Sequence, residues 1–273
     1  MADLAKSFNM MGRTAVITGG AGLLGRQFSK TLAEAGASVV VADLYEDKAA
    51  EVAEEIRAAG GKAAATALDV TSPESTDAMA AFAAHEFGSL DVIVNSAALD
   101  PKFESDMRGK HSNAFEEYPV EKWNAALHVN LTGTFLATQS AVRQMLKQGS
   151  GVVVNICSTY GLVGPDQRIY QRPGQPPEYK PVDYSVTKAG ILGFTRYLAA
   201  FYGDRNIRVN ALSPGGVYNQ HDEEFSKAYS SRTILGRMSN IDEMNGAMLY
   251  LCSDASSYMT GSNLIVDGGW TAW

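Results

Sequence analysis

Tyr184 and Lys188 are the two residues whose types and spacing point most directly to chemistry. They lie four positions apart in the segment YSVTK, which opens a stretch with helical periodicity, so both side chains project from one face of a helix. A free phenol has a pKa of about 10 and is a poor base at neutral pH, but a neighbouring ammonium favours the phenolate. The pair predicts a general acid/base that exchanges a proton with a substrate oxygen.

The same spacing occurs a second time, at Tyr118 and Lys122, so spacing alone is not specific. That copy has a proline between its partners and no serine at the end of a preceding strand. Tyr184 instead follows Ser158, at the end of the apolar segment GVVVNICS, and Asn130, in the helical segment HVNLTG. Ser158 can donate to a substrate oxygen or cap a helix, and Asn130 can also bond a neighbouring backbone group. The four residues together favour a catalytic set.

A glycine-rich segment, TGGAGLLG at 18–25, joins the first apolar segment to a helical one. Its spacing Gly20-x-Gly22-x-x-Gly25 lets the backbone turn tightly and approach a pyrophosphate at the helix N-terminus. A tight turn that binds nothing is the alternative. Asp43 ends the second apolar segment about 20 residues later, which completes the pattern of a dinucleotide site.

Asp43 also discriminates between the two nicotinamide dinucleotides. Its carboxylate can accept hydrogen bonds from both adenosine ribose hydroxyls, whereas the 2′-phosphate of NADP would bring like charges into contact. Leu44, Tyr45 and Glu46 follow, so no adjacent cation offsets that repulsion. The sequence therefore predicts NAD, with a helix N-cap role for Asp43 as the alternative.

The elements that must position these residues alternate regularly along the chain. Apolar, β-branched segments are each followed by a segment of helical periodicity, and we expect helices near 23–35, 46–59, 73–87 and 120–147 and after Asp183. Strands that are apolar on both faces predict a doubly wound (Rossmann) α/β fold with a parallel seven-stranded sheet. The expected strands are RTAVIT, ASVVVAD, KAAATALDV, LDVIVNSAA, GVVVNICS, IRVNALSP and NLIVDGG.

Length and composition favour a single catalytic domain over 1–273, with 45% hydrophobic residues to form its core. A formal charge of −7 argues against a nucleic-acid surface. The chain has no apolar run long enough to span a bilayer and begins without a secretory signal, so we expect a cytoplasmic protein. Cys157 and Cys252 lack metal-ligand spacing and are expected to be buried thiols, with no metal site.

Three irregular segments, at about 99–118, 159–183 and 217–232, follow expected strands at their carboxyl ends, where ligands bind in such folds. The second contains five prolines, which favour an ordered wall, and polar side chains that suit a hydroxyl-rich or anionic ligand. These polar side chains can equally face water. They are Gln167, Arg168, Gln171, Arg172 and Gln175.

Over essentially the whole chain, these segments resemble the single-domain members of the short-chain dehydrogenase/reductase family. The resemblance rests on TGGAGLLG, Asp43, LDV at 68–70, VNSAA at 94–98, HVNLTG, Ser158, YSVTK, RVNALSPGG at 208–216 and LIVDGG at 264–269. It implies that Ser158 polarises the substrate oxygen, Tyr184 exchanges its proton, Lys188 holds the nicotinamide ribose and Asn130 positions a relay water. The implied cofactor-binding residues are Gly19, Gly22, Leu23, Leu24, Asp43, Leu44, Asp69, Val70, Asn95, Ala97, Tyr184, Lys188, Pro214 and Val217.

The sequence departs from the family pattern in three places. Leu23 stands where the central glycine is usual, as in the larger sugar-nucleotide epimerases and dehydratases, but only 60 residues follow Ser213, too few for their substrate domain. NSAA replaces the usual Asn-Asn-Ala-Gly, and Ser158 and Tyr184 are 26 positions apart, about twice the usual gap. The segments YGLVGPDQ and SPGGVYN resemble bacterial members from flagellin-glycan and unusual-sugar pathways.

The sequence predicts an NAD-dependent oxidoreductase that interconverts a secondary alcohol and a ketone, on a polar sugar-like or polyol substrate. A non-catalytic NAD-binding sensor or assembly subunit, and an epimerase or dehydratase that retains its NAD, are the alternatives. We expect a homotetramer, because NLIVDGGWTAW places an edge strand and two large apolar side chains, Trp270 and Trp273, at the chain end. Folding of both tryptophans onto their own subunit is the alternative.

Overall fold

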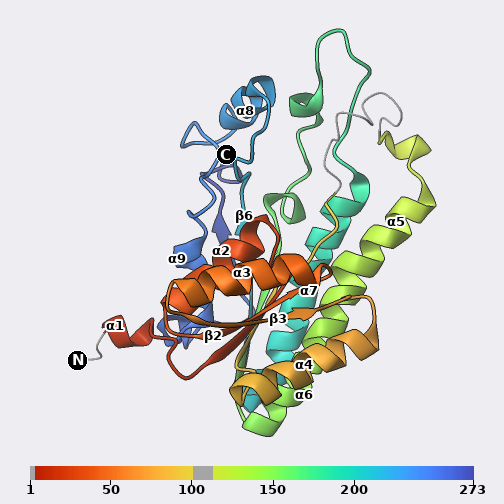
Figure 1. The fold of residues 1–273 in the computed structure, drawn as a ribbon. Coiled ribbons are helices and arrows are strands. Elements are labelled where there is room, and N and C mark those ends of the chain that lie inside the picture. Colours follow the sequence, from red (N-terminus) through yellow and green to blue (C-terminus); the bar gives the residue numbers. More distant parts are fainter. Residues whose placement is uncertain (1–3, 101–112) are drawn as a thin grey trace.

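The computed structural model describes residues 4–100 and 113–273, and within them seven strands form one parallel sheet. The strand order is β3-β2-β1-β4-β5-β6-β7 (Figure 1). The expected doubly wound fold is therefore confirmed. The strands are β1 (Thr14–Thr18), β2 (Ser38–Asp43), β3 (Lys62–Ala67), β4 (Val92–Asn95), β5 (Gly151–Ile156), β6 (Ile207–Pro214) and β7 (Asn263–Val266).

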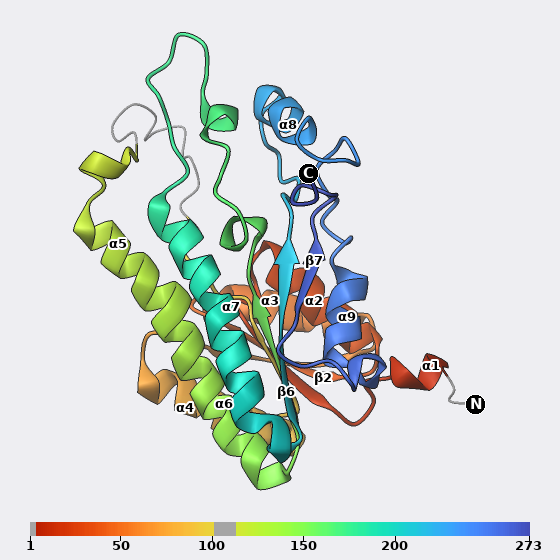
Figure 2. The same ribbon diagram turned by 180° about the vertical axis from the view of Figure 1, so that it is seen from behind.

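Helices cover both faces of the sheet, and the alternation of side chains along each strand explains why. On β1, Ala15 and Ile17 belong to one buried cluster, whereas Val16 between them belongs to another. The first cluster includes side chains of α2 (Leu23–Glu34), α3 (Glu46–Ala58) and α9 (Asn245–Cys252). The second includes side chains of α4 (Pro73–Phe87), α6 (Thr134–Gln148) and α7 (Val182–Tyr202). Figure 2 shows these two groups of helices on opposite sides of the sheet. Because each strand is buried on both faces, its sequence is a continuous apolar run.

The expected helices are present, with one change inside the longest. The segment expected as one helix over 120–147 contains a π-helical turn, His128–Gly133, between two α-helices. Three further helices in the described ranges, α1, α8 and α9, were not predicted. The helices are α1 (Leu4–Ser7), α2 (Leu23–Glu34), α3 (Glu46–Ala58), α4 (Pro73–Phe87), α5 (Val120–Leu127), α6 (Thr134–Gln148), α7 (Val182–Tyr202), α8 (Glu223–Ser230) and α9 (Asn245–Cys252).

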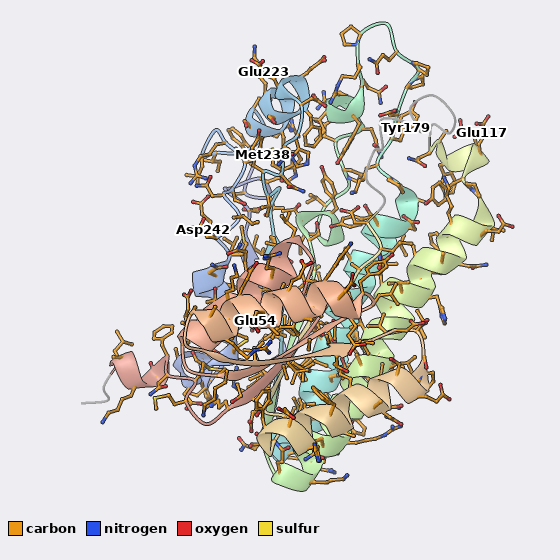
Figure 3. The ribbon with its side chains drawn as sticks, in the orientation of Figure 1. Glu54, Glu117, Tyr179, Glu223, Met238 and Asp242 are labelled. Carbon is orange, nitrogen blue, oxygen red and sulfur yellow. The ribbon has the colours of Figure 1, made fainter. Side chains whose placement is uncertain are left out.

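The described parts of the three expected substrate loops lie at the carboxyl edge of the sheet. Residues 101–112 of the first lie outside the described part of the chain. The second, 159–183, contains two 3₁₀ turns, Thr159–Gly161 and Gln167–Tyr170, and the third contains α8. Figure 3 places Tyr179 of the second loop and Glu223 of α8 at this same end of the molecule.

The C-terminal segment bears out one expectation and corrects another. β7 forms an edge of the sheet, as expected. Trp270, however, is 7% exposed and stacks on Tyr229 of its own chain, with ring centroids 4.3 Å apart. The inference that Trp270 needs a partner subunit to cover it is therefore wrong. Trp273 remains 76% exposed, and its indole N–H donates to the Arg232 carbonyl at 3.1 Å.

Cys157 and Cys252 are both buried and unpaired, as expected. Among the helices described, none combines the length and the apolar character needed to cross a bilayer.

Candidate active site

The glycine-rich segment turns between β1 and α2 at the carboxyl edge of the sheet. Gly19 has a φ of +62°, and a Cβ there would lie 2.8 Å from the Ala97 Cα. A Cβ on Gly25 would lie 2.0 Å from the Gly19 carbonyl oxygen, so the first turn of α2 packs directly on the loop. Among the described atoms, a Cβ on Gly22 would meet that carbonyl alone, at 3.1 Å. The turn thus leaves open backbone at the helix N-terminus, which suits a pyrophosphate.

Asp43 ends β2 beside this turn. Its Oδ2 accepts the Ala21 N–H at 3.0 Å, and its Oδ1 accepts the Tyr45 N–H at 3.3 Å. The N-cap residue of α3 is Tyr45, so the N-cap alternative for Asp43 is excluded. The Lys48 ammonium lies 4.6 Å from the centroid of the Tyr45 ring, two residues after Asp43 in the sequence.

Three residues expected near the adenosine differ in exposure. Leu44 is 61% exposed, and Asp69 is also exposed. Asp69 Oδ1 accepts the Thr71 N–H at 2.9 Å and the Thr71 hydroxyl at 2.7 Å, and these bonds hold the pKa of Asp69 below its usual value. Val70 is buried, and a Cβ on Gly133 would lie 2.6 Å from Val70 Cγ2. Leu44 and Asp69 are therefore available to a ligand, while Val70 mainly packs against the π-helical turn.

The Asn95 side chain is buried too deeply to contact a ligand directly. It is 4% exposed, and its Nδ2 donates to Thr138 Oγ1 and Asn155 Oδ1, each at 2.8 Å. Its Oδ1 has no hydrogen-bond partner among the described residues. The neighbouring Ala97 N–H donates to Thr18 Oγ1 at 3.1 Å. The Asn95 amide thus ties β4 to β5 and α6, and the backbone at Ala97 lies against the glycine-rich turn.

Asn130 lies in the π-helical turn and joins two loops of the site. It is 2% exposed, and its Oδ1 accepts the Leu99 N–H at 2.7 Å. Its Nδ2 donates to the Leu99 carbonyl at 3.1 Å and to Thr187 Oγ1 at 3.2 Å. Asn130 therefore fixes the segment after β4 against α7, and wide turns of this kind occur frequently at functional sites.

Ser158, Tyr184 and Lys188 come together where β5 meets the start of α7. The Lys188 ammonium lies 5.8 Å from the centroid of the Tyr184 ring and donates to the Ile156 carbonyl at 2.9 Å. The Ser158 hydroxyl lies close enough to the Tyr184 phenol to lower its pKa in part. Ser158 also caps the first 3₁₀ turn, because its Oγ accepts the Tyr160 N–H at 3.2 Å. The arrangement offers a proton carrier with a hydroxyl and an ammonium beside it.

The surroundings of Tyr184 set its protonation state. Burial raises the pKa of the phenol, the Asp100 carboxylate raises it further, and the Ser158 hydroxyl lowers it in part. Burial also lowers the pKa of Lys188. In the protein alone, Tyr184 is therefore protonated at neutral pH, which is the form that donates a proton to an alkoxide.

The second Tyr–Lys copy has a different role. Tyr118 donates its hydroxyl to Asp183 Oδ2 at 2.6 Å, and burial and this carboxylate raise the pKa of Tyr118. Lys122 is exposed on α5. Tyr118 thus supports the first turn of α7, immediately before Tyr184.

An aromatic wall, which the sequence analysis missed, stands beside Tyr184. The Tyr160 ring packs edge-on against Tyr184, with centroids 6.4 Å apart, and against Trp270 at 6.1 Å. The Tyr170 hydroxyl donates to the Tyr160 hydroxyl at 2.9 Å. Phe225 and Tyr229 are four positions apart on α8, but the wall as a whole joins three distant segments of the chain, so no sequence signal groups all of its residues. The wall consists of Tyr160, Tyr170, Phe225, Tyr229 and Trp270.

The Gln and Arg side chains of the second loop, apart from that of the exposed Gln175, make hydrogen bonds within the protein. Both Asp166 oxygens accept from Arg168, at 2.8 Å each. Arg172 Nη2 donates to both Asp222 oxygens at 3.0 Å and so ties the loop to α8. Gln171 Nε2 donates to the Glu178 carbonyl at 2.6 Å. These side chains make the loop an ordered wall, as its prolines predict, but they are committed to bonds within that wall.

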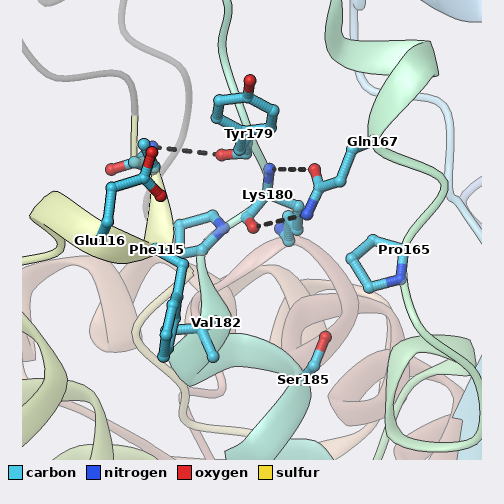
Figure 4. Close-up of a pocket in the computed structure, with 11 residues that line it drawn as sticks. Phe115, Glu116, Pro165, Gln167, Tyr179, Lys180, Val182 and Ser185 are labelled. Carbon is cyan, nitrogen blue, oxygen red and sulfur yellow. Dashed lines mark hydrogen bonds between the residues drawn. The ribbon is translucent and has the colours of Figure 1, made fainter.

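A second lysine, Lys180, also reaches Tyr184 and was not anticipated. Its ammonium lies 4.0 Å from the centroid of the Tyr184 ring and donates to Asp100 Oδ1 at 2.7 Å. Gln167 holds the Lys180 backbone from both sides, accepting its N–H at 2.8 Å and donating to its carbonyl at 3.2 Å (Figure 4). Lys180, Gln167 and Ser185 line a cavity of about 460 Å³ next to the site.

Pro214 and Val217 flank the turn after β6. Pro214 ends the strand, and Val217 forms an isolated bridge with Ser239. Leu23, the first residue of α2, is 40% exposed, and Leu24 packs against the core. No group of three or more His, Cys, Asp or Glu side chains in the described ranges is placed to hold a metal ion.

Comparison with known proteins gives one family over nearly the whole chain. Residues 20–271 match the family model described as Enoyl-(Acyl carrier protein) reductase. The chain is 36% identical to 2,5-dichloro-2,5-cyclohexadiene-1,4-diol dehydrogenase LinX from Sphingobium indicum, over 96% of this chain and 97% of that protein.

Two solved structures are similar along their entire length. A short-chain type dehydrogenase/reductase from Mycobacterium marinum matches with a TM-score of 0.86 and 32% identity, over 99% of this chain and 100% of that one. A gluconate 5-dehydrogenase from Burkholderia cenocepacia, in complex with NADP and tartrate, matches with a TM-score of 0.87 and 29% identity, with the same coverage.

Proposed function

Because this chain belongs to the short-chain dehydrogenase/reductase family and its relatives oxidise secondary alcohols, it is an alcohol/ketone oxidoreductase, and we propose that it uses NAD and acts on a polar, hydroxyl-rich substrate. The observation that carries the proposal is the convergence of Ser158, Tyr184 and Lys188 at the carboxyl edge of the sheet. The substrate class follows relatives named for a cyclic diol and for gluconate.

The chain's own residues fit a nicotinamide dinucleotide. A Cβ on Gly22 would meet only the Gly19 carbonyl oxygen, at 3.1 Å, whereas a Cβ on Gly19 or Gly25 would lie closer than 3 Å to backbone. The pyrophosphate would lie on this turn, the adenosine ribose at Asp43 and the nicotinamide ribose at Lys188. The residues that would hold the cofactor are Gly19, Gly22, Leu23, Leu24, Asp43, Leu44, Asp69, Ala97, Tyr184, Lys188, Pro214 and Val217, with Asn95 and Val70 supporting them from beneath.

When bound, the cofactor supplies the acceptor for the hydride that leaves the carbinol carbon. Ser158 donates a hydrogen bond to the substrate oxygen and holds it against Tyr184. The Tyr184 oxygen takes the hydroxyl proton as the carbonyl forms, and in the reverse direction it returns that proton. Lys188 stabilises the phenolate, and Asn130 keeps α7 and the segment after β4 in fixed positions.

Asp43 supports the choice of NAD. Its two oxygens are held by backbone N–H groups of the glycine-rich turn and of Tyr45, so the negative charge stays at the tip of β2. At least two structural neighbours were solved with NADP bound, which makes a direct comparison of the two cofactors necessary.

The test is NADH formation by the purified protein with a panel of polyols, sugar acids and cyclic diols, with Tyr184→Phe as the control. We expect turnover by the wild type and a loss of at least about a thousandfold in Tyr184→Phe, which keeps the ring but loses the proton carrier. NADH binding without turnover of any alcohol would favour a sensor or assembly subunit. Stoichiometric cofactor retained through purification, with turnover but no net redox change, would favour an epimerase or dehydratase.

We also propose a homotetramer, for which the uncovered edge strand β7 and the exposed Trp273 remain the supporting features. Sedimentation of the wild type as a monomer at micromolar concentration would end this proposal. The cytoplasmic location likewise stays a prediction.

A further inference from the structure

Two ammonium groups approach Tyr184, and the nearer one does not belong to the YSVTK pair. Lys180 Nζ lies 4.0 Å from the centroid of the Tyr184 ring, against 5.8 Å for Lys188 Nζ. The Lys180 side chain is only 11% exposed, so its charge is weakly screened by water. A cation over the face of a phenol is attracted to the ring and still more strongly to the phenolate.

Hydrogen bonds to its backbone hold Lys180 in this position over the Tyr184 ring. Gln167 bonds both the N–H and the carbonyl of Lys180, and Pro181 directly follows it before α7 begins. Gln167 belongs to the segment that makes the gap between Ser158 and Tyr184 unusually long. The inserted loop therefore places an ammonium group beside the acid/base residue Tyr184.

The Asp100 carboxylate partly offsets the effect of the Lys180 ammonium on Tyr184. Its carboxylate accepts from Lys180 Nζ at 2.7 Å and, by itself, raises the pKa of Tyr184. Asp100 is about half exposed and Lys180 is nearly buried, so solvent screens the carboxylate more than the ammonium. The charged or titratable groups of the described residues that face Tyr184 are Lys180, Lys188, Asp100, Cys157 and Tyr160, with His221 near Lys180.

We propose that Lys180 and Asp100 are a positioning pair that sets the acidity of Tyr184 for the alcohol/ketone reaction. The inference rests on the proposed role of Tyr184 as the proton carrier. Lys180 stabilises the phenolate that accepts the proton during alcohol oxidation, and Asp100 limits that stabilisation so that the phenol can still donate during ketone reduction.

The experiment measures kcat/KM for alcohol oxidation against pH in the wild type, Lys180→Met, Asp100→Asn and the double variant. Lys180→Met leaves the carboxylate uncompensated, so we expect the apparent pKa to rise by about one pH unit, a loss of about tenfold below that pKa and little loss on the alkaline plateau. Asp100→Asn should shift the profile the other way, and the double variant should return near the wild-type pKa.

Lys180→Arg, which keeps the charge, should retain most of the wild-type profile, and Lys147→Met removes one exposed charge at the distant end of α6 and should shift nothing. A Lys180→Met profile lowered equally at every pH, with no restoration in the double variant, would show a purely structural role and overturn the inference. If Lys180→Met fails to fold, an unshifted Asp100→Asn profile overturns it equally well. Tyr184→Phe distinguishes failure of this inference from failure of the proposed function, because a fully active Tyr184→Phe would refute the proton-carrier role itself.

Discussion

Replacing Asp43 by serine should change the cofactor preference by removing a charge that the structure holds in place. Asp43 Oδ2 accepts the Ala21 N–H at 3.0 Å, inside the turn that would carry the pyrophosphate. To admit a 2′-phosphate, the carboxylate must either stay and repel it or rotate away and lose this bond. Both routes cost free energy, and the cheaper one sets the discrimination.

The structure allows both costs to be bounded. Two unit charges at about 4 Å and an effective dielectric of about 20 repel by roughly 4 kcal/mol, which corresponds to about a thousandfold. Losing a hydrogen bond to a charged group costs about 1.5–3 kcal/mol, or roughly ten- to a hundredfold. Because the cheaper route sets the discrimination, the wild type should prefer NAD over NADP by roughly one to two orders of magnitude in kcat/KM. In Asp43→Ser, that ratio should fall to within about tenfold of unity.

The assay is kcat/KM with NAD and with NADP, measured with one alcohol for the wild type, Asp43→Ser and Asp43→Ser/Lys48→Ala. Lys48 lies over the Tyr45 ring two residues beyond Asp43, so its ammonium should aid NADP once the carboxylate is gone. The double variant should then lose part of the gained NADP activity. Equal efficiency of the wild-type enzyme with both cofactors would refute the reasoning, because the carboxylate would then exert no discrimination.

Other variants test the turn, the acid/base residue and the chain end. Burial raises the pKa of Tyr184, so the rate of alcohol oxidation should rise with pH through that pKa and the rate of ketone reduction should fall. Rate–pH profiles measured in both directions check this, and parallel profiles would contradict it. Gly25→Ala puts a Cβ 2.0 Å from the Gly19 carbonyl oxygen and should weaken NADH binding at least about tenfold in a fluorescence titration. Gly193→Ala on α7, with open space at its Cβ, is the matched control and should bind normally. Trp270→Ala removes a buried ring and should cost about 3–5 kcal/mol, lowering the melting temperature by roughly 10 °C, whereas Trp273→Ala should lower it far less. A normal melting temperature for Trp270→Ala would contradict the packing seen here.

The fold was predictable because its two faces leave a direct mark on the sequence. On β2, Val39 and Val41 enter one core and Val40 enters the other, so the strand has to read as an unbroken apolar run. Asp43 interrupts that run only where the strand emerges at the carboxyl edge. The same logic applies to β1, which is why the sequence predicts where the glycine-rich turn and Asp43 lie relative to the sheet.

The parts that were missed depend on contacts between distant segments. The π-helical turn around Asn130 has no distinct sequence period, and it is held by bonds from Asn130 to Leu99 and Thr187. α8 is a short helix whose Asp222 caps its first turn and pairs with Arg172 of the second loop. Such elements are stabilised mainly by tertiary contacts, so local propensity alone does not predict them.

The polar side chains of the second loop show why composition is a weak guide to a ligand. Arg172 is only 14% exposed on its side chain, and a cation at that depth requires a fixed anionic partner, which Asp222 provides. Gln167 likewise uses its whole amide on the Lys180 backbone. A loop without regular secondary structure becomes rigid when its polar side chains bond to groups within the loop and its neighbours, and those side chains are then not available to a ligand. What the loop then presents beside Tyr184 is the Tyr160 ring, its part of the aromatic wall, and the Lys180 ammonium. The selectivity of the enzyme should follow those groups rather than the number of Gln and Arg residues.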